Sequence, residues 1–364
     1  MTPRPRICVL QVPLFDPARA LGGAEVMAVE LVRALTAVGQ VTVLHGVAED
    51  ADRGPRRFTG LAAEVHGAFP LDDYVREHGH IRPRLDARAA GNVEEADIIV
   101  TVERSLDLPS RAARVVTLGG VGYPHTLEVL AHRAWDTLVV PSQFVADQVR
   151  ARAPHARGVT VVANGVDTDL FRPSDKARAS TDHLRLLVAS RPTWDKGLLR
   201  VFDLARDLQG LGLRPRVVCF TQPGGYGPND FLPKATRAGA GLDLEILPWR
   251  TRDLMPDAYR SAHLTLCLGD AEEGFGLVAA ESVATGTPVL ATPAGFLRDM
   301  LPPEHGLVLV EPDASAPDLV TAARCATRLG PDACRALGRP YVARHYGLSR
   351  TRAELARVVQ LAAG

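Results

Sequence analysis

Two glutamates frame a glycine-containing segment whose residue types suit ligand binding. Seven residues separate Glu273 from Glu281, and a Gly-Phe-Gly-Leu run, Gly274 to Leu277, follows the first glutamate directly. The segment comes after an apolar run at 264–268 and opens a helical pattern. Glycines let backbone amides approach a ligand closely, and the first amides of a helix favour anions. The pattern predicts a loop that binds an anionic ligand through its backbone.

Glu281 falls among small apolar residues of the predicted helix, such as Ala280 and Val283. A carboxylate in such a place needs a partner, because burying it alone is costly. Sugar or ribose hydroxyls are natural partners, since an ionised carboxylate only accepts hydrogen bonds and hydroxyls donate them. In the alternative interpretation, Glu273 caps the start of the helix and Glu281 pairs with an arginine.

Arg191 and Lys196 form a second candidate group. Arg191 follows an apolar run at 184–189, and Lys196 lies five residues further on, where a helix is expected to start. Both are expected at the carboxyl end of a strand, where open α/β sheets bind ligands. Cations fixed there would stabilise negative charge on a ligand or on a leaving group. The alternative for Lys196 is a solvated residue in the first turn of the helix.

Trp249 and Arg250 are further candidates for ligand contact, because they follow the apolar run at 244–247. Trp249 could offer a stacking face, and Arg250 could supply backbone and planar contacts. Packing of Trp249 against the protein itself is an equally good interpretation.

The elements that must position these residues alternate along the whole chain. Short apolar runs, often β-branched, alternate with helical patterns, which predicts parallel α/β sheets covered by helices on both faces. A stretch rich in turn formers from residue 165 predicts a connection between domains at 1–165 and 166–345. A last helix within 346–364 is expected to pack back on the first domain. The predicted strands are 7–14, 41–45, 97–102, 115–118, 137–140, 159–163, 184–189, 217–220, 244–247, 264–268, 289–291 and 307–310.

Composition narrows the class of protein. The 364 residues carry a formal net charge of zero, so no nucleic-acid-binding surface is indicated. The five cysteines form no CxxC pair, which favours a reducing cytoplasm and no structural zinc. No apolar run is long enough for a membrane helix. Arginines scattered through 53–88 could meet a membrane surface, but such residues are usually a solvated face, and peripheral membrane contact is not otherwise indicated.

Five motifs in register resemble those of the retaining family 4 glycosyltransferases, which have the GT-B fold. The glutamate pair with its Gly-Phe-Gly run is the first of them. The others are Gly22-Gly23-Ala24-Glu25, Asn164-Gly165-Val166-Asp167, Ser190-Arg191 with Lys196-Gly197, and Gly286-Thr287-Pro288-Val289. The resemblance implies two Rossmann-like domains with parallel sheets facing a central cleft, and a C-terminal helix that crosses back to the first domain. Residues 47–95 match nothing in the family.

The resemblance also implies a function. A hexosyltransferase-like enzyme would move a sugar from a nucleoside-diphosphate donor, most simply a UDP- or GDP-sugar, to a hydroxyl of a small-molecule, glycan or lipid-linked acceptor. It would retain the anomeric configuration, with the departing phosphate taking the acceptor's proton, and would need no metal or other cofactor. The first domain would bind the acceptor and the second the donor. The implied catalytic residues are Glu273, Arg191 and Lys196, and the implied donor-binding residues are Gly22, Gly23, Gly274, Phe275, Gly276, Leu277, Glu281, Trp249 and Arg250.

One position departs from the family pattern. A histidine that contacts the donor sugar is usual where this chain has Gly119, and His125 lies six residues further on. His125 could replace it as a sugar or acceptor contact, although a lone histidine is more often structural. Two other functions stay open. One is a non-catalytic nucleotide-sugar-binding protein, and the other is a sugar phosphorylase or epimerase on the same fold.

Overall fold

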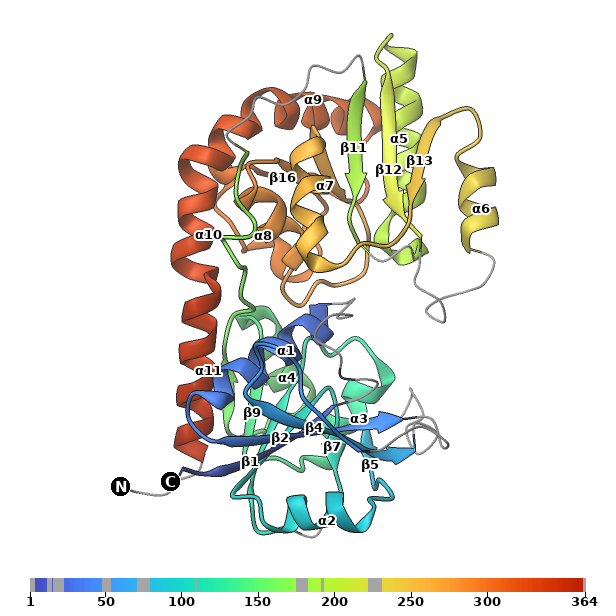
Figure 1. Ribbon diagram of the computed structural model, residues 1–364. Helices are drawn as coiled ribbons and strands as arrows, with labels where there is room; N and C mark the ends of the chain where they lie inside the picture. The colour runs from blue at the N-terminus through green and yellow to red at the C-terminus, as the bar shows by residue number, and fades with distance from the viewer. Residues whose placement is uncertain are drawn as a thin grey trace. The chain divides into compact units, whose positions relative to one another are not determined.

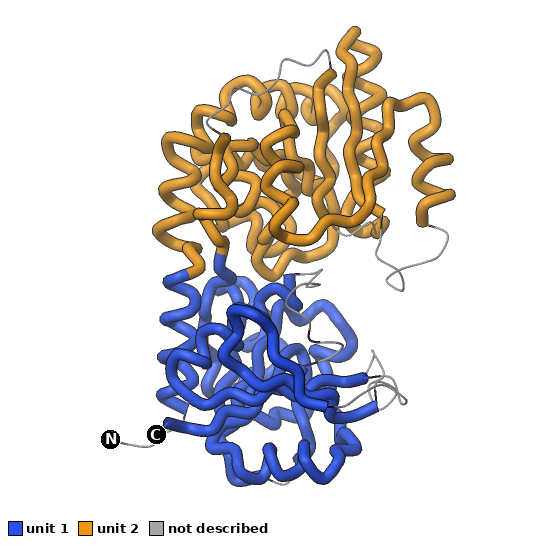
Figure 2. Tube along the Cα trace, in the orientation of Figure 1, with its two compact units in different colours: residues 1–165, 349–364 blue, residues 166–348 orange. Residues whose placement is uncertain are grey.

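In the computed structural model of the chain, short buried strands alternate with helices, as in other α/β proteins. The structure describes residues 4–11, 15, 23–47, 54–70, 79–108, 110–174, 183–190, 193–221 and 231–362. The chain divides into two units (Figure 2). Unit 1 comprises residues 1–165 and 349–364, and unit 2 comprises residues 166–348.

Unit 1 is built on an eight-stranded sheet with the order β10-β9-β8-β6-β1-β2-β4-β3. Neighbouring strands are parallel except at one edge, where β3 runs antiparallel to β4. Two further short strands, β5 and β7, pair with each other. The strands are β1 (Arg6–Gln11), β2 (Gln40–Val47), β3 (Pro55–Arg56), β4 (Ala63–Pro70), β5 (His80–Ile81), β6 (Ile98–Val102), β7 (Ser105–Leu106), β8 (Ala113–Thr117), β9 (Thr137–Val140) and β10 (Val159–Val161).

Helices cover both faces of this sheet. Alternate residues of β1 enter different apolar clusters: Val9 packs with residues of α1 and α11, and Leu10 packs with residues of α2. This two-sided burial explains why the strands read as continuous apolar runs. The helices are α1 (Gly23–Thr36), α2 (Ala87–Glu94), α3 (Pro124–His132), α4 (Gln143–Arg152) and α11 (Leu348–Ala362).

The C-terminal helix α11 completes the core of unit 1. Leu355, Val358 and Val359 are buried in the same apolar cluster as α1. The Arg352 Nε donates to the Glu30 carboxylate of α1 at 2.7 Å. Unit 1 is therefore assembled from both ends of the chain.

Unit 2 is built on a six-stranded parallel sheet with the order β13-β12-β11-β14-β15-β16, seen with its covering helices in Figure 1. Apolar residues recur on one face of α5 at helical spacing, and that face packs on the sheet beside α9. The strands are β11 (Leu184–Val188), β12 (Pro215–Phe220), β13 (Asp243–Leu247), β14 (Leu264–Cys267), β15 (Val289–Ala291) and β16 (Leu307–Leu309). The helices are η2 (Trp194–Lys196), α5 (Leu198–Gly210), α6 (Phe231–Ala238), η3 (Arg252–Leu254), α7 (Met255–Ser261), α8 (Leu277–Ala284), η4 (Gly295–Arg298), η5 (Pro303–His305), α9 (Ala316–Ala333), η6 (Cys334–Gly338) and α10 (Arg339–Tyr346).

Each sheet has a point at which the chain reverses its direction of travel across the strands. In unit 1 the chain moves from β1 outward through β2 and β4, and then returns to β6 on the other side of β1. In unit 2 it moves from β11 through β12 and β13, and then returns to β14 on the other side of β11. The carboxyl ends of the strands at such a switch point are where open α/β sheets bind ligands.

The alternating pattern predicted most of the strands in both sheets. All twelve predicted strands are present, although residues 12–14 of the first lie outside the described residues. Four strands were missed: β3, β4, β5 and β7. The strand β4 is almost wholly buried, but its Glu, His, Gly and Pro residues hide it from a search for apolar runs. The expectation of parallel sheets is confirmed, and the edge strand β3 is the antiparallel member of the first sheet.

None of the helices among the described residues has the length and apolar character that a bilayer crossing demands.

Candidate functional site

Lys196 and Glu273 meet at the switch point of unit 2. Lys196 is the last residue of η2, after β11, and Glu273 lies in the loop between β14 and α8. The Lys196 ammonium forms a hydrogen-bonded ion pair with the Glu273 carboxylate. The side chains are 17% and 31% exposed, so a ligand can reach both. The expected helix start at Lys196 is a single 3₁₀ turn, and α5 begins two residues later.

Two glycines allow the loops that carry this pair to touch. A Cβ at Gly197, whose φ is +78°, would lie 2.3 Å from the carbonyl group of Leu268. A Cβ at Gly269 would lie 2.3 Å from the Asp195 carbonyl oxygen. No side chain fits at either position without moving backbone, so both glycines are needed to bring Lys196 to Glu273.

The backbone of Glu273 is also held by η4, the 3₁₀ turn that follows β15. The Phe296 amide donates to the Glu273 carbonyl oxygen at 2.8 Å. A Cβ at Gly295, whose φ is +60°, would lie 2.4 Å from the same oxygen. Glu273 is therefore positioned by main-chain contacts, and it does not cap α8: the N-cap residue is Gly276, where no side chain of the described residues supplies a cap.

The Gly-Phe-Gly run has a packed side chain between two glycines. The Phe275 ring is buried and stacks on Phe296, with centroids 5.7 Å apart, and meets the Tyr346 ring edge-on at 5.1 Å. Gly276 has a φ of +93°, and a Cβ there would lie 2.6 Å from Leu297. The ring of Phe275 thus anchors the loop, while its backbone and that of Gly274 and Leu277 lead into the start of α8.

Glu281 has protein partners. Its side chain lies in α8 and is buried, the Tyr259 hydroxyl donates to one carboxylate oxygen at 3.0 Å, and Arg252 lies 3.1 Å from the other. Burial raises the pKa of Glu281, and Arg252 and the Tyr259 hydrogen bond oppose that rise. Burial and the nearby carboxylate raise the pKa of Tyr259 well above its ordinary value, so its hydroxyl remains a donor. An arginine partner is therefore found, as in the alternative interpretation, and a ligand hydroxyl is not needed to explain the buried carboxylate.

Trp249 and Arg250 both contact Phe220. The Trp249 ring meets the Phe220 ring edge-on, with centroids 6.3 Å apart, and the Arg250 guanidinium lies 6.0 Å from the centre of the same ring. Trp249 thus packs against the protein, and its indole N–H is buried without a hydrogen-bond partner among the described residues. These contacts position both side chains just after β13.

Two predicted residues of unit 1, Gly119 and His125, lie beside a residue that was not predicted, Glu103. Its carboxylate accepts a hydrogen bond from the Gly119 amide at 2.5 Å, and its other oxygen lies 3.7 Å from His125 Nε2. Gly23 is the first residue of α1. Gly22 and Arg191 lie outside the described residues.

Carboxylates and other metal ligands are dispersed in the described structure. No group of three His, Cys, Asp or Glu side chains there could hold a metal ion. An Asp-x-Asp spacing does occur at Asp167 and Asp169. The Asp167 carboxylate accepts hydrogen bonds at 3.1 Å from the amides of Asp169 and Leu170, so it stabilises a turn. The same spacing at residues 50–52 lies outside the described residues.

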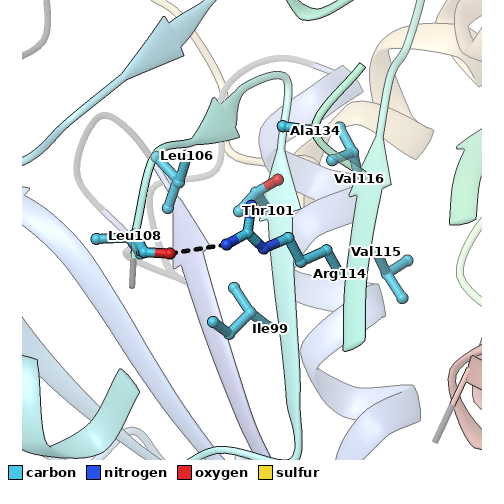
Figure 3. Close-up of a pocket in the computed structure, with 8 residues that line it drawn as sticks. All are labelled: Ile99, Thr101, Leu106, Leu108, Arg114, Val115, Val116 and Ala134. Atoms are coloured by element: carbon cyan, nitrogen blue, oxygen red, sulfur yellow. Dashed lines mark hydrogen bonds between the residues drawn. The ribbon is translucent and has the colours of Figure 1, made fainter. Parts of the chain in front are cut away.

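A small cavity in unit 1 contains none of the predicted residues (Figure 3). Its lining is mostly apolar, and the Arg114 guanidinium donates to the Leu108 carbonyl oxygen at 2.7 Å. The Arg114 guanidinium therefore already has a hydrogen-bond partner within unit 1.

Two family profiles match the chain, one on each unit. The profile of Glycosyl transferases group 1 matches residues 173–324, and that of Glycosyltransferase Family 4 matches residues 21–170. Together they span most of the sequence. The chain belongs to the family 4 glycosyltransferases.

Several curated members of the family are similar in sequence. The D-inositol 3-phosphate glycosyltransferase of Segniliparus rotundus is 29% identical over 64% of this chain and 54% of that protein. The same-named protein of Thermobispora bispora is 34% identical over 57% of this chain and 51% of that protein. The lipopolysaccharide 1,2-N-acetylglucosaminetransferase of Salmonella typhimurium is 29% identical over 49% of this chain and 50% of that protein. The chain spans about half the length of the curated relatives it matches.

Solved structures match over nearly the full chain. The sucrose-phosphate synthase of Thermosynechococcus elongatus has a TM-score of 0.76 at 17% identity and covers 98% of both chains. The Anabaena protein HepE in complex with UDP and glucose has a TM-score of 0.72 at 18% identity, over 98% of this chain and 99% of that one. At such identities the likeness shows the fold, which is GT-B.

Sequence reasoning about this family 4 member missed residues that act through long-range contacts. None of the motifs includes Gly269, Gly295, Arg252 or Tyr259. Only the folding of the chain brings these residues close to Glu273 and Glu281. Glu103 carried a signal that could have been used, because it is the first charged residue after the buried run of β6. Polar residues in that position lie at the edge of the sheet that binds ligands.

Proposed function

We propose that this chain is a retaining glycosyltransferase that moves a sugar from a nucleoside diphosphate to an acceptor hydroxyl without a metal ion. Unit 2 binds the donor in this proposal, and unit 1 binds the acceptor. The observation that carries it is the meeting of Lys196 and Glu273 at the switch point of unit 2. A cation there can bind the phosphates of a nucleotide sugar, and a carboxylate can accept hydrogen bonds from its sugar hydroxyls.

Lys196 supplies positive charge to the departing diphosphate. As the bond between sugar and phosphate breaks, negative charge collects on the phosphate oxygens, and a fixed ammonium lowers the free energy of that state. Its ion pair with Glu273 does not prevent this role, because partly exposed pairs contribute about 0.2–1 kcal/mol and a diphosphate competes with them easily. Arg191 is proposed as a second cation on the basis of the sequence.

Glu273 and the start of α8 orient the rest of the donor. Glu273 accepts hydrogen bonds from sugar hydroxyls, and the backbone amides of Gly274 to Leu277 face the phosphates at the positive end of the helix. Glu281 lies about one turn further along α8 and holds the ribose in this proposal, with Arg252 and Tyr259 keeping its carboxylate in place. Trp249 and Arg250 lie beside the nucleobase.

The substrates are proposed from the relatives. HepE binds UDP and glucose, which favours a UDP-sugar as the donor. Relatives named for D-inositol 3-phosphate and for lipopolysaccharide favour a polyhydroxylated acceptor. Retention follows from the proposal that the departing phosphate oxygen takes the acceptor's proton on the same face of the sugar, so that no separate protein base is required.

A transfer assay with charge-removing variants tests the proposal. The purified chain is supplied with UDP-glucose and a panel of acceptors that includes D-inositol 3-phosphate, with and without a chelator. Lys196→Ala and Glu273→Ala should each lower kcat/KM at least about tenfold, and the loss for Lys196 should approach 10²–10³. The exposed Lys234 of α6 provides the control, and Lys234→Ala should keep wild-type activity.

Specific outcomes contradict the proposal. Wild-type turnover in both Lys196→Ala and Glu273→Ala would remove this site from the reaction. An inverted anomeric centre in the product, read by NMR, would contradict retention. Donor binding without turnover across the acceptor panel would indicate a binding protein, and dependence on free phosphate would indicate a phosphorylase.

A further inference from the structure

Glu103 has a backbone conformation that is uncommon for a residue with a side chain. Its φ is +60°, in the left-handed region that residues with a side chain rarely adopt. Among the described non-glycine residues, the other positive φ belongs to Arg133, the C-cap of α3, where a left-handed residue commonly ends a helix. Glu103 ends no helix. Strain of this kind persists where the surrounding structure imposes it, and it gathers at binding sites.

The strained residue lies at the switch point of unit 1. It directly follows β6, the strand to which the chain returns after β4. In unit 2 the corresponding strand is β14, and the loop after it carries Glu273. Both carboxylates therefore occupy the edge of a parallel sheet where ligands bind.

Among the described residues, the Glu103 carboxylate has partners that hold it in place but do not saturate it. The Gly119 amide donates to one oxygen at 2.5 Å, and His125 Nε2 lies 3.7 Å from the other. An ionised carboxylate can accept about four hydrogen bonds. The side chains of Glu103 and His125 are 20% and 19% exposed, so their remaining polar positions are accessible to a ligand.

Glycine at position 119 makes room for this carboxylate. A Cβ at Gly119 would lie 3.0 Å from Glu103 Oε1, tighter than ordinary contact. The place that a side chain of residue 119 would enter is therefore filled by the side chain of Glu103. A polar group is still present there, supplied by the residue that follows β6.

An aromatic surface lies next to the pair. The Tyr123 ring is stacked on the His125 ring, with centroids 5.4 Å apart and planes 10° apart. Tyr123 is 49% exposed. Hydrogen-bonding groups beside an exposed aromatic ring suit a ligand that has hydroxyls on its rim and C–H groups on its face.

We propose that Glu103 and His125 form a subsite on unit 1 that binds hydroxyl groups of a polyhydroxylated ring, with Glu103 accepting from them. The Glu103 carboxylate repels other anions. The part of the ring that contacts Glu103 and His125 therefore carries no negative charge. That the ring belongs to a sugar substrate rests on the proposed function. The hydroxyls belong either to the donor sugar or to the acceptor.

Two binding measurements on the full chain test the subsite. Saturation-transfer NMR with D-glucose and with myo-inositol, at saturating UDP, measures binding of a free ring. Calorimetry with UDP and with UDP-glucose measures the contribution of the donor sugar. Glu103→Gln keeps the shape and can still accept from Gly119, but it loses the charge, so we expect an approximately tenfold loss of affinity for the ring. Gly119→Ala displaces the carboxylate without neutralising it, and we expect a loss of about threefold.

Matched variants serve as controls. Glu95 is an exposed carboxylate of unit 1 paired with Arg6, so Glu95→Gln should leave all affinities unchanged. A Cβ at Gly120 meets nothing within 4 Å, so Gly120→Ala is the control for Gly119→Ala.

The outcomes separate the two sources of the ring. If Glu103→Gln weakens UDP-glucose but not UDP, the hydroxyls are those of the donor sugar; if it weakens only the free rings, they are those of the acceptor. Unchanged binding of UDP-glucose and of both rings would overturn the proposal, as would a wild-type protein that binds neither ring and does not distinguish UDP-glucose from UDP. Failure of the wild-type protein to bind UDP would instead contradict the proposed function.

Discussion

The two switch points place charged side chains at matching positions but fix them by different means. In unit 2, Lys196 and Glu273 meet because Gly197 and Gly269 allow two loops to touch through their backbones. In unit 1, Glu103 is fixed by its own left-handed backbone and by a hydrogen bond to the Gly119 amide. One arrangement is held by packing and the other by a strained residue.

This difference has consequences for stability. A site held by packing should lose its geometry and its stability together, because the same contacts support both. A site held by strain should behave in the opposite way, since relaxing the strained residue stabilises the fold while it removes the function. Substitutions in the two units can separate these cases.

The largest effect is expected at Gly197. Gly197→Ala places a methyl group 2.3 Å from the Leu268 carbonyl group and forces alanine to a φ of +78°. We expect a loss of about 3 kcal/mol in the free energy of unfolding, from overpacking and backbone strain together. Urea unfolding measures it. Gly210→Ala, at the end of α5 where a Cβ meets nothing within 4 Å, is the control and should not destabilise. Equal losses in both variants would show that the contact with Leu268 does not hold the loop.

A smaller loss is expected at the buried hydroxyl beside Glu281. Tyr259→Phe removes the donor to a buried carboxylate, which should cost about 1–3 kcal/mol of unfolding free energy. Tyr123→Phe removes a hydroxyl from an exposed residue of unit 1 and should change stability by no more than about 0.5 kcal/mol. Similar effects at the two tyrosines would weaken the contrast between a packed site and an open one.

The pH dependence of stability gives a directional test at Glu281. Because its pKa is raised in the folded protein above the ordinary 4.5, folding favours its protonated form. Its contribution to stability is therefore greatest below pH 4.5 and is lost as the pH rises through the raised value. Glu281→Gln, which is always neutral, should gain in melting temperature relative to the wild type as the pH rises across that range. A constant difference in melting temperature would contradict the raised pKa.

The smallest effect is expected from relaxing Glu103. Glu103→Gly should raise the free energy of unfolding by up to about 1 kcal/mol, since glycine adopts the left-handed region without strain. Arg133→Gly relaxes the other left-handed residue, at the end of α3, and should stabilise similarly. Only Glu103→Gly should lose binding of the ring. A Glu103→Gly protein that is destabilised and still binds the ring would mean that Glu103 is structural.

The strand pattern and the motifs of the second half could be predicted from the sequence, because each of them depends on residues that are neighbours along the chain. Buried parallel strands read as apolar runs, and Lys196 and Glu273 each follow such a run. The strand β4 was not accessible, because its buried His66, Gly67 and Pro70 resemble a loop in composition. The partners of Glu281 were not accessible either, since the sequence indicated only that a buried carboxylate needs one.

The sequence by itself determined most of the strands and several of the charged residues that follow their carboxyl ends. The tertiary structure alone decided which of them meet. Lys196 and Glu273 are 77 residues apart, and they come together because the chain returns to lay β14 beside β11. Glu103 meets Gly119 because β6 and β8 are neighbours. Local patterns set the conformation of each segment, but the order of strands in a sheet depends on how all the segments bury their apolar faces at once.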